Sequence, residues 1–92
     1  MSEDMPLTVD KVSAGMKFYK DTVTLEIIEV NVVKGYRSDD TYIIAYRLRD
    51  GNFVSPVAHI FVKRGEDVRK HIELVIDNYL NNRNYIKSVL SG

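Results

Sequence analysis

The chain has 92 residues, of which 45% are hydrophobic and 28% charged, and it contains no cysteine. This length and balance predict one small domain and argue against wholesale disorder. The lack of cysteine excludes disulfides and thiolate metal sites. The 13 basic side chains equal the 13 acidic ones, which excludes a strongly basic nucleic-acid binder and leaves only a locally basic face for such a role.

The N-terminus is polar and acidic, unlike a secretory signal. No apolar run approaches the roughly 20 residues that span a bilayer. We therefore expect a cytoplasmic protein without membrane contact. Residues 1–7 are predicted to be a flexible tail, and residues 8–92 a single α+β domain.

Two strands are expected next along the chain, at residues 16–20 and 22–33. The apolar pattern of the second strand changes phase between Ile27 and Ile28. Strict alternation would send one of its two apolar sets into water. The pattern therefore predicts a β-bulge or sharp bend at this point, which would let one strand serve two sheet surfaces.

A hairpin is expected from residues 41–49 and 52–62, with Asp50-Gly51 as its turn. Pairing across that turn puts Leu48 opposite Phe53 and Tyr42 opposite His59. Pro56 needs an edge or a bulge because it has no N–H to donate. One face of the hairpin then carries Tyr42, Ile44, Tyr46, Leu48, Phe53, Val57, His59 and Phe61. The other face carries Ile43, Ala45, Val54, Pro56, Ala58, Ile60 and Val62, with Arg47 and Arg49 near the turn. Both faces are apolar, so both need cover from this chain or from a partner.

A helix is expected after Glu66 and Asp67, whose carboxylates complement the helix dipole. Its buried stripe is predicted to be Val68, Ile72, Val75, Ile76 and Tyr79. The asparagine-rich residues 81–84 weaken this helix, and residues 85–90 either continue it after a kink or dock separately. We expect the helix to cover the face with Ala45 and Ala58, because small side chains allow close approach.

These elements together predict an α+β fold, with a bent antiparallel sheet or partial β-barrel of about four strands and a C-terminal helix. The same strand and helix order occurs in some single-strand-binding proteins, which is an analogy of shape.

The sequence contains no recognisable catalytic motif. Ser55 and His59 are about four residues apart on one strand, roughly 13 Å, which is too far for direct proton transfer. The isolated glycines match no phosphate-binding motif, and Asp39-Asp40 lacks the further acidic residues of a cation cage. We expect no enzymatic activity, no cofactor and no metal.

The candidate binding surface combines aromatic and basic side chains of the hairpin and the loop before it. Single-stranded nucleic acids bind such surfaces, because bases stack on rings while cations track phosphates. The candidate residues are Tyr42, Tyr46, Phe53, His59, Lys34, Arg37, Arg47 and Arg49. The alternative interpretation of an aromatic stripe on a strand is core packing, and it stays open.

The apolar C-terminal segment is a second candidate surface, formed by Tyr85, Ile86, Val89 and Leu90. This segment can dock on its own domain, insert into a second copy or engage another protein. The sequence thus predicts a non-enzymatic binding module for single-stranded nucleic acid or a nucleic-acid machine. The alternative is a protein-interaction module that acts as a homodimer or an adaptor.

Overall fold

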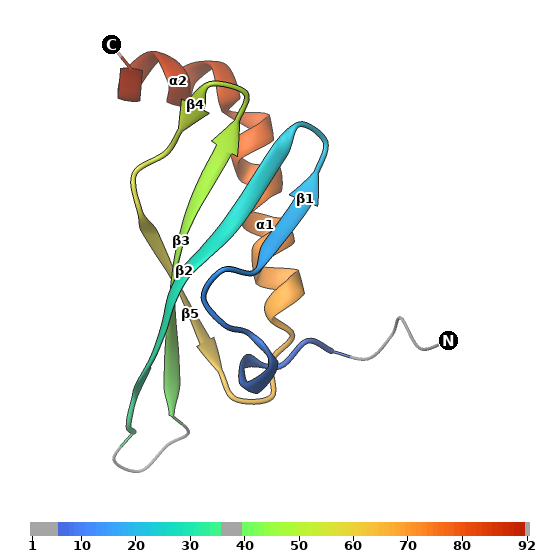
Figure 1. The fold of residues 1–92 in the computed structure, drawn as a ribbon, viewed down its shortest axis with the longest axis vertical. Coiled ribbons are helices and arrows are strands. Elements are labelled where there is room, and N and C mark those ends of the chain that lie inside the picture. Colours follow the sequence, from blue (N-terminus) through green and yellow to red (C-terminus); the bar gives the residue numbers. More distant parts are fainter. Residues whose placement is uncertain (1–5, 36–39, 92) are drawn as a thin grey trace.

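The computed structural model describes residues 6–35 and 40–91, without the side chains of Leu90 and Ser91. The elements follow in the order η2 (Val9–Lys11), β1 (Lys17–Lys20), β2 (Val23–Val33), β3 (Thr41–Asp50), β4 (Phe53–Val54), β5 (Ala58–Lys63), α1 (Val68–Asn81) and α2 (Arg83–Ser91). The predicted α+β fold is confirmed, because a bent antiparallel sheet is followed by C-terminal helices (Figure 1). None of the described helices is both long and apolar enough to cross a membrane.

The sheet is antiparallel, with β1 paired to β2 and β2 paired to β3. Two short strands share the far side of β3. β4 pairs with Arg49 and Asp50, and β5 pairs with residues 41–46. Figure 1 shows α1 running alongside β1 and the upper part of β2, while α2 lies across the top of the molecule.

The predicted bulge is present in β2. Ile27 pairs with Tyr46 and Glu29 pairs with Ala45, so Ile28 is the extra residue. Directly paired residues point to the same face, and the bulge therefore returns Val30 to the face of Ile27. The bulge keeps one apolar face continuous, so the expectation that β2 serves two sheet surfaces is wrong.

The predicted register of the hairpin is wrong. Asp50, and not Leu48, pairs with Phe53, which makes Gly51 and Asn52 the two turn residues. Gly51 has a φ of +63° and Asn52 does not have a positive φ. A positive φ at the first turn residue alone is the pattern of a type II′ turn, which favours glycine there. This preference explains why the turn starts at Gly51 rather than at Asp50.

A second irregularity changes which side chains share a face. Residues 55–57 interrupt the hairpin, and β5 resumes with Ala58 opposite Tyr46. Pro56 lies in this interruption, as predicted for a residue that cannot donate a ladder hydrogen bond. Between Val54 and Ala58 the second arm of the hairpin has one residue more than the facing stretch of β3. This extra residue moves His59 and Phe61 to the face opposite the tyrosines.

α1 covers the tyrosine face of β3, so the expected position of the helix over Ala45 is also wrong. The extra residue places Val62 and Ile60 beside Tyr42 and Ile44, which makes this the face with more apolar surface to bury. The buried core cluster comprises Val9, Val12, Val23, Leu25, Ile27, Ile44, Leu48, Val62, Val68, Ile72, Ile76 and Tyr79. The predicted helix stripe is confirmed, with Val75 partly buried at its margin.

The start of α1 is fixed by Asp67. Its carboxylate accepts hydrogen bonds from the backbone N–H of Leu7 at 3.0 Å and of Arg69 at 3.1 Å. The N–H of Val68 donates to the carbonyl of Leu7 at 2.8 Å. The bond from Leu7, together with that from Arg69, holds the pKa of Asp67 below its usual value. Leu7 ends the expected tail, of which residues 1–5 lie outside the described part of the chain.

Candidate functional site

The sheet separates the candidate nucleic-acid residues into two groups. Tyr42, Tyr46 and Phe53 lie on the α1 side, where they are partly buried against the core. Arg47 and Arg49 point to the opposite face. His59 joins these arginines because it pairs with Ala45. The expected single surface of rings and cations is therefore divided between the two faces.

The two loop residues of that set lie apart from the rest of it. Lys34 follows β2, at the end of the sheet remote from Gly51, and its Nζ lies 3.4 Å from Oδ2 of Asp40. Arg37 lies outside the described residues. The loop thus adds no described cation to either group.

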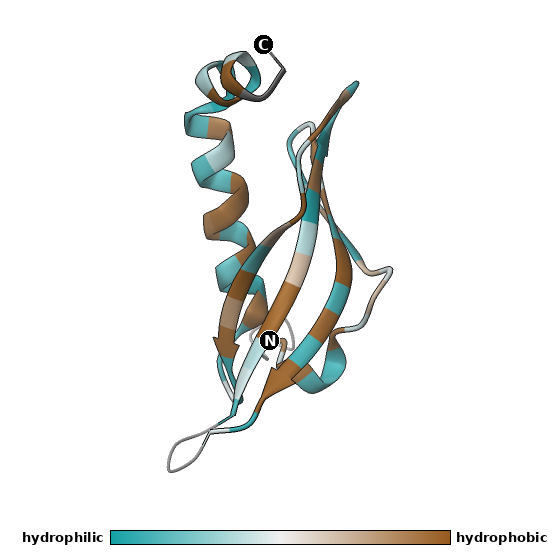
Figure 2. Cartoon of the chain, turned by 90° about the vertical axis from the view of Figure 1, so that its left-hand side faces the viewer, coloured by the Kyte–Doolittle hydropathy of each residue, from teal (hydrophilic) through white to brown (hydrophobic). Residues whose placement is uncertain are grey.

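We call the strand side chains that point away from α1 the outer face. From β1 to β5 they are Lys17, Tyr19, Thr24, Glu26, Glu29, Asn31, Val33, Thr41, Ile43, Ala45, Arg47, Arg49, Val54, His59, Phe61 and Lys63. Figure 2 shows α1 to one side of strands that carry alternating hydrophilic and hydrophobic bands. On the outer face, Tyr19 is 72% exposed and Phe61 61% exposed.

Cations occupy neighbouring positions at the Gly51 end of the outer face. Arg49 lies beside Thr24, and Arg47 beside Glu26, which in turn pairs with Lys17. Arg49 Nε is 3.6 Å from Oε1 of Glu26. The Nε of Arg47 is buried and has no hydrogen-bond partner among the described residues.

A buried carboxylate, Asp50, joins four elements on the α1 side. Its oxygens accept hydrogen bonds from the hydroxyls of Thr22 and Tyr79, both at 2.9 Å. From α2, Arg83 Nη1 lies at 3.4 Å and Lys87 Nζ at 3.5 Å. Burial raises the pKa of Asp50, but these partners outweigh burial and hold the pKa below its usual value. A carboxylate so fully paired fastens α2 to the sheet and is a poor base.

Phe53 belongs to this cluster and is not a free platform for a base. Its ring stacks on Tyr79 with centroids 5.9 Å apart. The Nζ of Lys87 lies 5.9 Å from the centroid of the same ring. The four side chains that contact the Asp50 carboxylate lie 28 to 37 positions from it in the sequence, and no local sequence pattern could have revealed the cluster. Tyr19, by contrast, was accessible to sequence analysis through the alternation of residues 16–20.

The C-terminal candidate residues have different environments. α2 is a separate helix that starts after Asn82, and its Ile86 packs against the core. Tyr85 is 72% exposed and Val89 58% exposed. The side chain of Leu90 lies outside the described residues. This segment therefore both docks on its own domain and presents apolar side chains to solvent.

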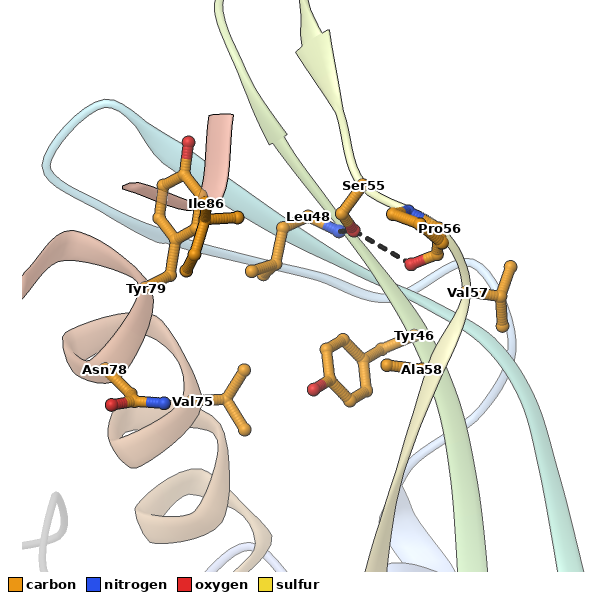
Figure 3. Close-up of a pocket in the computed structure, with 10 residues that line it drawn as sticks. All are labelled: Tyr46, Leu48, Ser55, Pro56, Val57, Ala58, Val75, Asn78, Tyr79 and Ile86. Atoms are coloured by element: carbon orange, nitrogen blue, oxygen red, sulfur yellow. Dashed lines mark hydrogen bonds between the residues drawn. The ribbon is translucent and has the colours of Figure 1, made fainter. Parts of the chain in front are cut away.

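A cleft of about 300 Å³ opens between the helices and the sheet (Figure 3). It is lined by Tyr46, Leu48, Ser55, Pro56, Val57, Ala58, Val75, Asn78, Tyr79 and Ile86. Figure 3 shows the rings and aliphatic groups of Tyr46, Ala58 and Val75 around the space between β3 and α1. We call this space the α1–β3 cleft.

No group of three or more His, Asp or Glu side chains suited to a metal ion occurs in residues 6–35 and 40–91. Comparison of the chain with models of protein families, with curated proteins and with solved structures finds no match.

Proposed function

We propose that the protein is a non-enzymatic binding module whose outer face contacts single-stranded nucleic acid, alone or within a nucleic-acid machine. The main support is the clustering of Arg47 and Arg49 on the same sheet face as the exposed ring of Tyr19. Tyr42, Tyr46 and Phe53 face α1 and are no longer proposed as stacking residues. The rings available for stacking are Tyr19, His59 and Phe61.

The charge of the outer face favours an anionic ligand. Its strand positions hold four cationic side chains and two carboxylates, an excess of two positive charges. Arg47 and Arg49 are two residues apart on β3, about 7 Å along an extended strand. They would contact successive parts of a phosphate backbone while bases stack on Tyr19 at the adjacent edge.

The test is a fluorescence-anisotropy titration of labelled single strands at low and moderate salt. Substituting both Arg47→Gln and Arg49→Gln should weaken binding about tenfold or more and reduce the salt dependence by about two phosphate contacts. The matched control substitutes Arg69→Gln and Lys70→Gln, two exposed cations of α1. No binding at low salt, or equal losses in the two double variants, would refute the proposal. Circular dichroism verifies that each variant is folded.

A second candidate function is a homodimer or adaptor that uses α2. Its support is the exposure of Tyr85 and Val89, which are four residues apart and so share one side of the helix. Light scattering should then give a dimer that Tyr85→Glu dissociates, whereas Leu74→Glu, at an exposed position of α1, leaves it intact. A monomer at high concentration excludes the homodimer.

A further inference from the structure

We propose that the α1–β3 cleft binds a small neutral molecule that combines an apolar ring with one hydrogen-bond acceptor, such as a hydroxyl or a carbonyl oxygen. The cleft lies on the α1 side of the sheet, opposite the outer face, so this binding does not depend on the proposed nucleic-acid contact. The volume of about 300 Å³ lies at the lower end of the range for ligand sites. An apolar cavity of roughly half that volume is known to bind benzene.

The walls of the cleft favour a neutral ligand. Apolar groups come from both layers, with Leu48 and Ala58 on the sheet and Val75 and Ile86 on the helices. None of the lining residues is Asp, Glu, Lys, Arg or His. A charged ligand would lose water here without gaining an opposite charge, which carries a large free-energy cost.

The hydroxyl of Tyr46 is the reason for expecting a hydrogen-bond acceptor on the ligand. Its side chain is half-buried, and no described residue forms a hydrogen bond with its hydroxyl. Burial raises the pKa of Tyr46, so the phenol stays protonated at neutral pH and can donate a hydrogen bond. The Ser55 hydroxyl is already used, since it accepts from the N–H of Leu48 at 2.9 Å and donates to the carbonyl of Pro56 at 3.0 Å.

The two layers offer apolar side chains on both sides of the cleft, between which one flat ring would lie. Figure 3 shows Tyr46 extending from β3 toward Val75 of α1, with Ala58 beside it. Ala58 is small, and the interruption at residues 55–57 keeps the chain out of regular pairing at this level. A ring placed between Val75 and Ala58 would bury apolar surface while its oxygen accepts from Tyr46.

The experiment is an NMR titration of the full ¹⁵N-labelled chain with benzyl alcohol, toluene, benzoate and benzylammonium. Saturable shifts of the Ala58 and Val75 amide signals are expected for benzyl alcohol, with at least about tenfold weaker effects of the two charged probes. Tyr46→Phe should weaken benzyl alcohol about fivefold and leave toluene unchanged, because only the alcohol has an acceptor.

Two tryptophan variants locate the bound probe. Val75→Trp fills the cleft and should abolish the shifts, whereas Leu74→Trp, at a neighbouring position that is 69% exposed, should preserve them. Ala58→Leu replaces Val75→Trp if that variant does not fold. The proposal is overturned if neither benzyl alcohol nor toluene gives saturable shifts, if the charged probes bind equally well, or if filling the cleft leaves binding intact.

Discussion

Tyr79 of α1 donates a hydrogen bond of 2.9 Å to Oδ2 of Asp50, the last residue of β3. The side chain of Asp50 is almost fully buried, and that of Tyr79 is the last buried position of α1. Burial, together with the neighbouring carboxylate of Asp50, raises the pKa of Tyr79 to about 12. The pair therefore joins helix to hairpin while Arg83 and Lys87 bring α2 to the same carboxylate.

Removing the charge of Asp50 should destabilise the protein. We expect Asp50→Asn to lower the free energy of unfolding by about 2–3 kcal/mol, because charged hydrogen bonds to Tyr79 and Arg83 are weakened in a buried site. Urea denaturation measures the change. The control is Asp77→Asn, which breaks an exposed ion pair with Lys20 and should cost less than about 1 kcal/mol. Equal losses of unfolding free energy in the two variants would show that the buried hydrogen bonds of Asp50 do not stabilise the fold more than an exposed ion pair does.

The same carboxylate should contribute to acid sensitivity. The pKa of Asp50 is lower in the folded protein than its usual value of 3.8, so its ionised form stabilises the folded state above that pH. This stabilisation is lost as the pH falls through the folded-state pKa. Urea denaturation between pH 7 and pH 2.5 should show the stability gap between the native chain and Asp50→Asn closing below about pH 4. A gap that does not narrow at all between pH 4 and pH 2.5 would contradict the assignment.

Adjacent isoleucines of β3 test which face α1 covers. Ile44 is fully buried on the α1 side, whereas Ile43 is partly exposed on the outer face. Ile44→Ala should lower the free energy of unfolding by about 3–4 kcal/mol, and Ile43→Ala by about 1 kcal/mol, because only the first leaves a cavity in the core. Chemical denaturation measures the unfolding free energy of both variants. A larger loss for Ile43→Ala would show that α1 covers the face of Ile43 instead.

Gly51 should be the sensitive residue of the hairpin turn. A Cβ at this position meets no atom within 4 Å, so the cost of a side chain comes from the φ of +63° alone. We expect Gly51→Ala to destabilise by about 1 kcal/mol and Gly51→Asn by less. Asn52→Ala should stay within about 0.5 kcal/mol. Thermal denaturation compares the three variants, and a dominant effect of Asn52→Ala would place the turn elsewhere.

Several features could be predicted from the sequence because their causes are local. The strands, the bulge near Ile28 and the stripe of α1 follow from side-chain periodicity within short stretches. The asparagine-rich residues 81–84 predicted a weakened helix, and the break between α1 and α2 lies there. The sequence left open whether residues 85–90 continue the helix or dock separately. The candidate cations Arg47 and Arg49 were also correctly expected near the hairpin turn.

Only the tertiary structure determined which of these side chains meet. The one-residue shift of the turn to Gly51 left Phe53 on the tyrosine side, but the extra residue around Pro56 moved His59 and Phe61 to the outer face. That single offset made the tyrosine face the one buried under α1. Periodicity cannot reveal it, because an inserted residue reverses every later position of a strand while leaving the alternation itself unchanged.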